Sequence, residues 1–168
     1  MLAAPARLGK TRVVAVDGPA GSGKSTLARA LALELNAPMI KTDHFATWDD
    51  PVAWWPRLVD GVLDPLARGE TGRYQRLDWT DGLPKPGRWI TIEPTDVLIL
   101  EGVSSARRSI APRLSYAFWL DGPTEAERLE RAVARDGQQH RQEFVNWQQW
   151  ERGWFAVDNT RSRADRII

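Results

Sequence analysis

Residues 18–25 carry the feature that most limits what this chain can fold into. Their sequence, Gly-Pro-Ala-Gly-Ser-Gly-Lys-Ser, matches the phosphate-loop (Walker A) pattern G-x-x-x-x-G-K-[ST] without a mismatch. Glycines let the backbone curl until successive N–H groups point inward at phosphate oxygens. Lys24 would place a positive charge on the β- and γ-phosphates of a nucleotide, and the Ser25 hydroxyl would bind Mg²⁺. The pattern requires a buried strand before it and a helix after it.

The residues on both sides of this loop meet that requirement. Residues 13–16 form a short β-branched run typical of a buried strand, and Leu27, Leu31 and Leu35 recur at the spacing of one helix face. Further strands are predicted at 39–42, 97–100, 116–120 and 166–168, and further helices at 51–68, 124–135 and 142–157. Nearly continuous apolar strands alternating with helices predict a three-layer α/β fold of the P-loop NTPase type, with a mainly parallel sheet of about five strands and helices on both faces.

Two local signals add detail to this outline. Asp50 and Pro51 have the residue types of an N-cap and a first helical position, in a helix that Gly69 would end. The turn-rich residues 73–94, with Asp81-Gly82 among them, predict a hairpin-like excursion from the main sheet. Neither a repeat nor a domain boundary is visible, so residues 1–168 are expected to form a single domain.

Composition excludes several classes of site and partner. Lys and Arg number 23 against 22 Asp and Glu, and a net charge of +1 gives no reason to expect a nucleic acid or an acidic membrane surface as partner. The absence of cysteine excludes disulfides, thiolate metal sites and cysteine nucleophiles. No apolar run approaches the length of a membrane span, and the first ten residues do not resemble a signal peptide. We therefore expect a cytoplasmic protein.

Two classes of phosphate-loop protein are disfavoured. The Asn-Lys-x-Asp motif with which GTPases read the base is absent, and 168 residues hardly accommodate the coupling elements of large ATPases. The class of small-molecule kinases remains. Ligands of open α/β sheets bind at the carboxyl ends of the strands, and here Asp43 and Glu101 close two of the predicted strands.

The chain resembles the uridine kinase and phosphoribulokinase-like family of P-loop kinases. The matching segments follow the family's order and cover nearly all of residues 13–168: 18–26, Asp43-His44-Phe45, Asp78-Trp79, 98–102, Arg131 with Arg135-Asp136, and 164–168. The resemblance implies a kinase domain that uses ATP and Mg²⁺ and closes a helical lid, at about 124–142, over its substrates. The nucleotide-binding residues would be Gly18, Ala20, Gly21, Ser22, Gly23, Lys24, Ser25 and Thr26.

The same resemblance implies roles for three carboxylates. Asp43 would accept the proton of the acceptor hydroxyl and help to order the metal. Glu101, with Ser25, would hold Mg²⁺ or its waters, and Asp78 would bind hydroxyls of the acceptor. Each carboxylate also has a structural alternative: a loop cap for Asp43, a helix N-cap for Glu101 and a hairpin turn for Asp78.

Three arginines of the expected lid share one helix face, because Arg128, Arg131 and Arg135 lie at i, i+3 and i+7. Arg131 and Arg135 would neutralise charge on the transferring phosphoryl group. Glu127 lies four residues before Arg131, so an ion pair on a solvated face is the competing interpretation.

The nine tryptophans fall into two groups that matter for the site. Trp79 and Trp89 flank the predicted hairpin and could stack on, or cover, the acceptor. Trp147, Trp150 and Trp154 recur at helical spacing, which more often indicates packing.

Three functions stay open. The first is a nucleoside kinase, the second a kinase of another small alcohol such as a sugar, a vitamin precursor or an antibiotic, and the third a regulator that binds ATP without an acceptor. A regulator needs no base, so the presence of both Asp43 and Glu101 disfavours it. Leu77 stands where uridine kinases carry Tyr, and their His-Ser-Arg segment has no counterpart within 80–88, so uridine is expected to be a poor acceptor. The sequence also leaves open a homo-oligomer.

Overall fold

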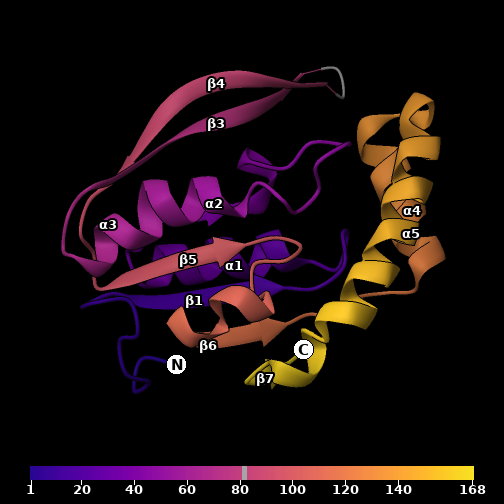
Figure 1. Ribbon diagram of the computed structural model, residues 1–168. Coiled ribbons are helices and arrows are strands. Elements are labelled where there is room, and N and C mark those ends of the chain that lie inside the picture. The colour runs from indigo at the N-terminus through magenta and orange to yellow at the C-terminus, as the bar shows by residue number, and fades with distance from the viewer. Residues whose placement is uncertain (81–82) are drawn as a thin grey trace.

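A parallel sheet of five strands forms the centre of the computed structural model, which describes residues 1–80 and 83–168 (Figure 1). The strand order is β2-β5-β1-β6-β7, and every neighbouring pair is parallel. The strands are β1 (Arg12–Asp17), β2 (Met39–Lys41), β5 (Val97–Glu101), β6 (Leu114–Trp119) and β7 (Arg166–Ile167). This arrangement confirms the expected fold class, although β6 begins and ends earlier than predicted.

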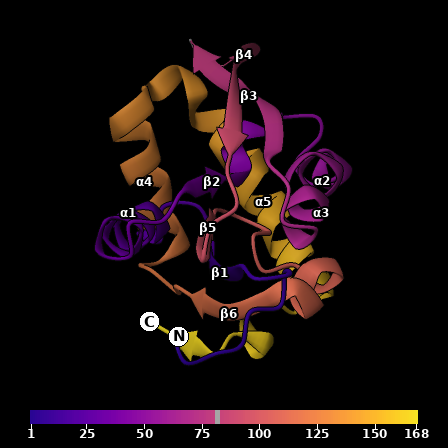
Figure 2. The same ribbon diagram turned by 90° about the vertical axis from the view of Figure 1, so that its left-hand side faces the viewer.

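Alternate residues of each central strand enter two separate cores. In β1, Val13 and Ala15 pack with side chains of α2 (Trp55–Leu58) and α3 (Asp64–Ala67). Val14 and Val16 pack on the other side with Ala28 of α1 (Lys24–Glu34). Figure 2 shows the sheet between α1 on one face and α2 with α3 on the other. Because both faces are buried, the strands read as unbroken apolar runs.

The helix expected to begin after Asp50 begins later, which corrects the prediction. Asp50 does accept a hydrogen bond from the Ala53 N–H at 2.7 Å, but it closes only a turn. The helical run consists of α2 (Trp55–Leu58), the π-helical segment η2 (Val59–Leu63) and α3 (Asp64–Ala67). Trp54 and Trp55 are buried and stack with ring centroids 4.8 Å apart. Burial of these two neighbouring indoles fixes the backbone before the helix, and tertiary packing overrides the capping signal.

The predicted excursion from the main sheet is an antiparallel hairpin of β3 (Gly72–Thr80) and β4 (Leu83–Ile92). It lies over α2 and α3, away from the central sheet (Figure 1). Gly61 allows the hairpin to approach the helices, because a Cβ there would lie 2.7 Å from the carbonyl oxygen of Arg73. The turn expected at Asp81-Gly82 lies outside the described residues.

The region predicted to be a lid, about 124–142, contains α4 (Glu125–Asp136), η4 (Gln138–His140) and only the first two residues of α5 (Arg141–Asp158). Thr124 and Glu127 form a capping box at the start of α4, with the Thr124 N–H donating to the Glu127 carboxylate at 2.9 Å. The described residues also form the short helices η1 (Thr42–His44), η3 (Arg108–Arg113) and η5 (Arg161–Arg163). Across 1–80 and 83–168, no helix has the length and apolar character needed to span a bilayer.

Candidate active site

The phosphate-loop motif lies between β1 and α1, as its pattern requires. Gly18 has a φ of +139°, and a Cβ at this position would collide with the carbonyl group of Leu120. Gly21 and Gly23 also have positive φ, at +78° and +99°. The loop curls because these positions adopt a conformation that other residues rarely take. Its glycines are therefore required by the backbone as well as by the motif.

Lys24, the first residue of α1, is held inside the loop. It is 6% exposed, and its Nζ donates a hydrogen bond to the Pro19 carbonyl at 2.7 Å. Thr26 donates its N–H to the Gly23 carbonyl at 3.0 Å as the helix begins. The positive end of the α1 dipole and the ammonium group thus act on the same place. This arrangement can bind a polyphosphate.

Ser25 and Glu101 are brought together from separate elements. The Ser25 Oγ donates to Glu101 Oε1 at 3.0 Å, from the first turn of α1 to the end of β5. Burial raises the pKa of the Glu101 carboxyl, the nearby charge of Asp43 raises it further, and Lys24 opposes both. Asp43 therefore lies close enough to act on Glu101. The three predicted metal-binding residues lie in one region.

This oxygen set fits Mg²⁺. Hydroxyl and carboxylate oxygens are the ligands that the hard cation prefers, and Mg²⁺ in nucleotide sites is bound by one or two carboxylates together with substrate phosphates. No group of three His, Cys, Asp or Glu in the described part of the chain forms a ready-made cage. Ser25 and Glu101 are the residues that would hold the ion once phosphate oxygens complete its shell.

On the acceptor side, Asp43 lies exposed in η1, directly after β2. Trp79 of β3 reaches across to it and donates its Nε1–H to the Asp43 backbone carbonyl at 3.0 Å. His44 contacts Tyr74, which is also in β3, with Nδ1 2.8 Å from the Tyr74 hydroxyl. Burial and nearby Arg76 lower the His44 pKa from 6.5 to about 4. His44 is therefore a neutral packing residue at neutral pH, whereas Trp79 joins the hairpin to the proposed base.

The other predicted acceptor contacts are engaged within the hairpin itself. Asp78 forms an ion pair with Arg76 on the same strand. Trp89 is 54% exposed, and the Arg73 guanidinium lies 4.6 Å from its ring centroid. The structure therefore brings Trp79, but not Trp89, to Asp43. An acceptor hydroxyl would have to share Asp78 with Arg76.

The three lid arginines have different surroundings. Arg128 is 9% exposed and donates its Nε–H to the Ala20 carbonyl of the phosphate loop at 3.0 Å. Arg131 is exposed, and Glu127, its ion-pair partner in the competing interpretation, serves in the capping box. The Thr124 hydrogen bonds lower the Glu127 pKa, and the charge of Arg131 adds to that effect. Arg135 pairs with Asp136, and nearby Asp43 adds to the rise in its pKa. Arg128 thus holds the loop, and Arg135 is the lid cation in electrostatic range of Asp43.

Sequence reasoning missed two buried carboxylates beside the loop. Asp17 ends β1 and accepts hydrogen bonds from the N–H groups of Gly18, Ser104 and Ala106, at 2.7, 3.1 and 2.8 Å. Glu151 of α5 accepts one from the Ala20 N–H at 2.7 Å. The sequence contains a feature that could have identified each of these two carboxylates. Asp17 ends an apolar strand, and Glu151 interrupts a helix face otherwise formed by tryptophans.

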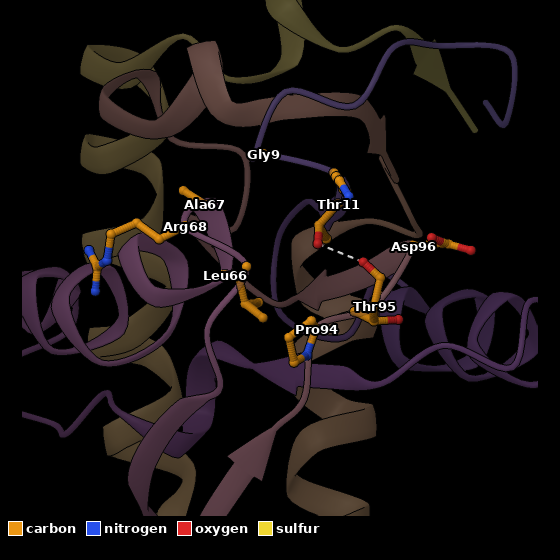
Figure 3. Close-up of a pocket in the computed structure, with 10 residues that line it drawn as sticks. Gly9, Thr11, Leu66, Ala67, Arg68, Pro94, Thr95 and Asp96 are labelled. Atoms are coloured by element: carbon orange, nitrogen blue, oxygen red, sulfur yellow. Dashed lines mark hydrogen bonds between the residues drawn. The ribbon is translucent and has the colours of Figure 1, made fainter.

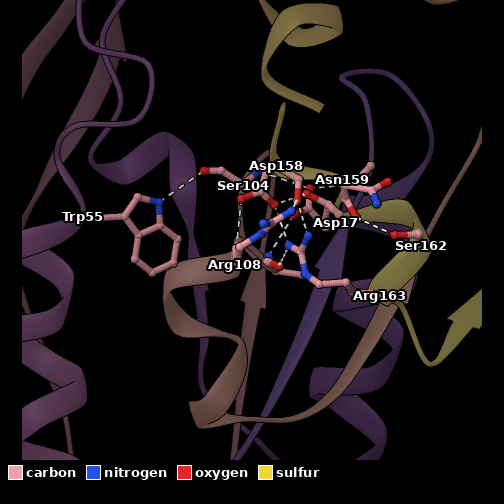
Figure 4. Close-up of polar contacts among 11 residues, drawn as sticks. Asp17, Trp55, Ser104, Arg108, Asp158, Asn159, Ser162 and Arg163 are labelled. Atoms are coloured by element: carbon pink, nitrogen blue, oxygen red, sulfur yellow. Dashed lines mark hydrogen bonds and ion pairs between the residues drawn. The ribbon is translucent and has the colours of Figure 1, made fainter. Parts of the chain in front are cut away.

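A further polar network holds the C-terminal end of α5 (Figure 4). Asp158 accepts the Arg108 N–H at 3.0 Å and bonds from Arg163 and Thr160, both at 2.6 Å. Arg108 follows β5, so this network ties the C-terminal end of α5 to the segment after that strand. Helix α5 is therefore anchored both at the phosphate loop and at the segment that follows β5.

A hollow lies on the opposite edge of the sheet, lined by Gly9, Thr11, Leu66, Thr95 and Asp96 among others (Figure 3). It adjoins the amino ends of β1 and β5. Ligands of open parallel sheets bind at the carboxyl ends. The polar groups described above, Lys24, Ser25 and Glu101, also lie at the carboxyl ends of the strands. We therefore place the candidate site at the phosphate loop.

Comparisons with known proteins agree on the nucleotide side of this site. A family described as cytidylate kinase matches residues 14–47, from β1 through η1. The bifunctional pantoate ligase/cytidylate kinase of Trichormus variabilis is 44% identical over 113 residues, which cover 58% of this chain and 20% of that protein. The corresponding protein of Synechococcus sp. is 32% identical over 116 residues, covering 51% of this chain and 23% of that one. The chain spans about a fifth of the length of the curated relatives it matches.

Similarity to solved structures covers nearly the whole chain. The structure of a possible uridine kinase from Bacillus stearothermophilus matches with a TM-score of 0.69 at 19% identity, covering 94% of this chain and 88% of that chain. The likeness confirms that this protein has the fold of the P-loop kinases. It also agrees with the family resemblance seen in the sequence.

Proposed function

We propose that this chain, which has the fold of the P-loop kinases, is a phosphotransferase that moves the γ-phosphate of ATP to a hydroxyl of a small metabolite. One observation carries the proposal: the Ser25 hydroxyl lies 3.0 Å from buried Glu101 beside the Lys24 ammonium, with Asp43 on the acceptor side. Phosphoryl transfer depends on positioned charges, and these are the groups it requires. A protein that only binds ATP has no need for a carboxylate at the acceptor side.

Each residue then has a role in the reaction. Lys24 and the loop N–H groups bind the β- and γ-phosphates. Mg²⁺ held by Ser25 and Glu101 would neutralise charge on the phosphates when bound. Asp43 accepts the proton of the acceptor hydroxyl as that oxygen attacks. Arg135, with Arg131, stabilises negative charge on the transferring group when the lid closes.

Trp79 and Asp78 define the acceptor side in this proposal. The Trp79 indole lies against the Asp43 loop through its hydrogen bond to the Asp43 carbonyl. A planar or apolar part of an acceptor would stack on it, which orients a hydroxyl toward the Asp43 carboxylate. A nucleoside is the first candidate acceptor, and a sugar or other small alcohol is the alternative.

The cytidylate kinase likeness adds a nucleotide as a second acceptor class to be tested. The family match, however, ends at residue 47, so it covers the phosphate loop and η1 but not the hairpin or the lid. These last elements carry Trp79 and the lid arginines. The match supports ATP binding more than it supports a particular acceptor.

A coupled assay of ADP release tests the proposal. The panel would contain uridine, cytidine, CMP, sugars and vitamin precursors, each with and without Mg²⁺. Turnover stimulated by an acceptor and dependent on Mg²⁺ supports a kinase. Tight ATP binding without stimulation by any acceptor would instead indicate a nucleotide-binding regulator.

A further inference from the structure

Helix α5 places a buried carboxylate against the phosphate loop. Glu151 is 2% exposed. Its Oε1 accepts hydrogen bonds from the Ala20 N–H at 2.7 Å and from the Trp147 indole N–H at 2.8 Å. Its Oε2 is buried and has no hydrogen-bond partner within residues 1–80 and 83–168. An N–H of the loop motif is thus occupied by a side chain 131 positions away in the sequence.

Two buried cations act on this carboxylate. Burial raises the pKa of the Glu151 carboxyl, and the positive charges of Lys24 and Arg128, which are 6% and 9% exposed, act against that rise and favour the carboxylate. A buried cation is costly without a counter-charge. The phosphates of a nucleotide would supply that charge in a loaded loop. In the free protein, Glu151 supplies part of that charge, and Glu101, on whose pKa Lys24 also acts, supplies another part.

We propose that the Glu151 carboxylate takes the place of a nucleotide phosphate in the free protein. It holds the loop to helix α5 and competes with the polyphosphate of a nucleotide for the loop. The inference rests on the proposed function, because it assumes that the loop binds nucleotide phosphates. When phosphates reach Lys24, the Glu151 carboxylate becomes a like charge beside them. Its contact with Ala20 then breaks, and the ligand's negative charge replaces it.

Release of Glu151 has a consequence on the acceptor side. Trp147, which donates to Glu151, also contacts Trp48, with ring centroids 6.0 Å apart. Trp48 in turn contacts Trp79 at 5.2 Å, and Trp79 is bonded to the Asp43 carbonyl. A contiguous set of contacts therefore joins the phosphate loop to the proposed base. Nucleotide binding would free helix α5 from the loop and change the packing around the acceptor site.

The variant Glu151→Gln tests the competition, because it removes the charge but keeps the size and the acceptor oxygen. Isothermal titration calorimetry, with no acceptor present, would measure Kd for MgATP and for inorganic tripolyphosphate. We expect both Kd values to fall at least about tenfold, since a buried like charge is removed. Glu130→Gln is the matched control. It removes a lid carboxylate that pairs with Arg141 at the surface, and both Kd values should stay as in the wild type.

A second variant keeps the proposal testable if Glu151→Gln does not fold, which thermal unfolding would reveal. Trp147→Phe keeps an aromatic ring but removes the N–H that holds Oε1, so the Kd for tripolyphosphate should fall about twofold or more. An unchanged or higher Kd in folded Glu151→Gln, or in Trp147→Phe where the first variant is unfolded, would overturn the inference. Tighter tripolyphosphate binding without turnover of any acceptor would refute the kinase proposal and leave this inference standing. Acceptor-stimulated turnover together with unchanged Kd values in the folded variants would support the kinase proposal and overturn this inference.

Discussion

Asp17 should make the free energy of unfolding decrease as the pH rises from about 4 to 7. The side chain is fully buried at the end of β1, and burial raises its pKa from 3.8 to about 7 in spite of three backbone hydrogen bonds. Within this interval the native state binds more protons than the unfolded state. The stabilising contribution of protonated Asp17 is therefore complete below the unfolded pKa and is lost as the pH rises through the folded pKa.

The size of the effect follows from the two pKa values. They differ by about 3 pH units, and each unit corresponds to about 1.4 kcal/mol, so the total is about 4 kcal/mol. Asp17→Asn removes the titration. Its Oδ1 can still accept from Gly18 and Ser104, but an amide nitrogen would replace the acceptor of Ala106. That loss costs about 1–3 kcal/mol at every pH. Relative to that of the wild type, the free energy of unfolding of the variant should rise by about 1.4 kcal/mol for each pH unit between 4 and 7, and it should not rise further above pH 7.

Urea unfolding between pH 4.5 and 8 would measure this difference. Asp60→Asn is the control, because it removes an exposed carboxylate that is solvated in both states, and its curve should run parallel to that of the wild type. His44 acts in the opposite sense. Burial lowers its pKa to about 4, so stability falls as the pH drops through its unfolded value. This contribution is common to all three proteins and cancels in the difference. Parallel curves for the wild type and Asp17→Asn would show that Asp17 is ionised in the folded protein and would refute the reasoning.

Three further outcomes concern turnover. Lys24→Ala should abolish it and weaken ATP binding, because the β- and γ-phosphates lose their cation; unchanged ATP affinity by titration calorimetry together with normal turnover would contradict this. Asp43→Asn should lower kcat by about 10²-fold or more with ATP binding nearly intact, and a variant that keeps most of its kcat would remove Asp43 from the role of base. Uridine and cytidine should be poor acceptors because Leu77 replaces a polar contact of the pocket. A kcat/KM at or above about 10⁴ M⁻¹s⁻¹ for either would show that the prediction is wrong.

Local sequence patterns determined most of the fold and the nucleotide side of the site. The motif at 18–25, the β-branched run at 13–16 and the leucines of α1 each describe a backbone conformation set by neighbours in the chain, and the structure has all three elements where they were predicted. Apolar runs likewise indicated the strands of the parallel sheet, because burial on both faces leaves no polar alternation. The approach of Ser25 to Glu101 followed from the rule that strand ends meet at one edge.

The start of the second helix shows where local patterns fail. Asp50 does bond the N–H three residues on, as a cap would. Helix nonetheless begins only at Trp55, because Trp54 and Trp55 are buried against each other and fix the backbone first. A weak local preference, on the order of 1 kcal/mol, yields to the burial of two indoles.

The environment of the phosphate loop was decided only by tertiary structure. Arg128 donates a hydrogen bond to the Ala20 carbonyl and Glu151 accepts one from the Ala20 N–H, from 108 and 131 residues away in the sequence. Asp17 accepts a hydrogen bond from the Ala106 N–H, 89 residues away. Nothing in the neighbouring sequence specifies which buried N–H a distant carboxylate will accept from. That choice depends on how α4 and α5 pack against the sheet and on the requirement that each buried charge find a partner.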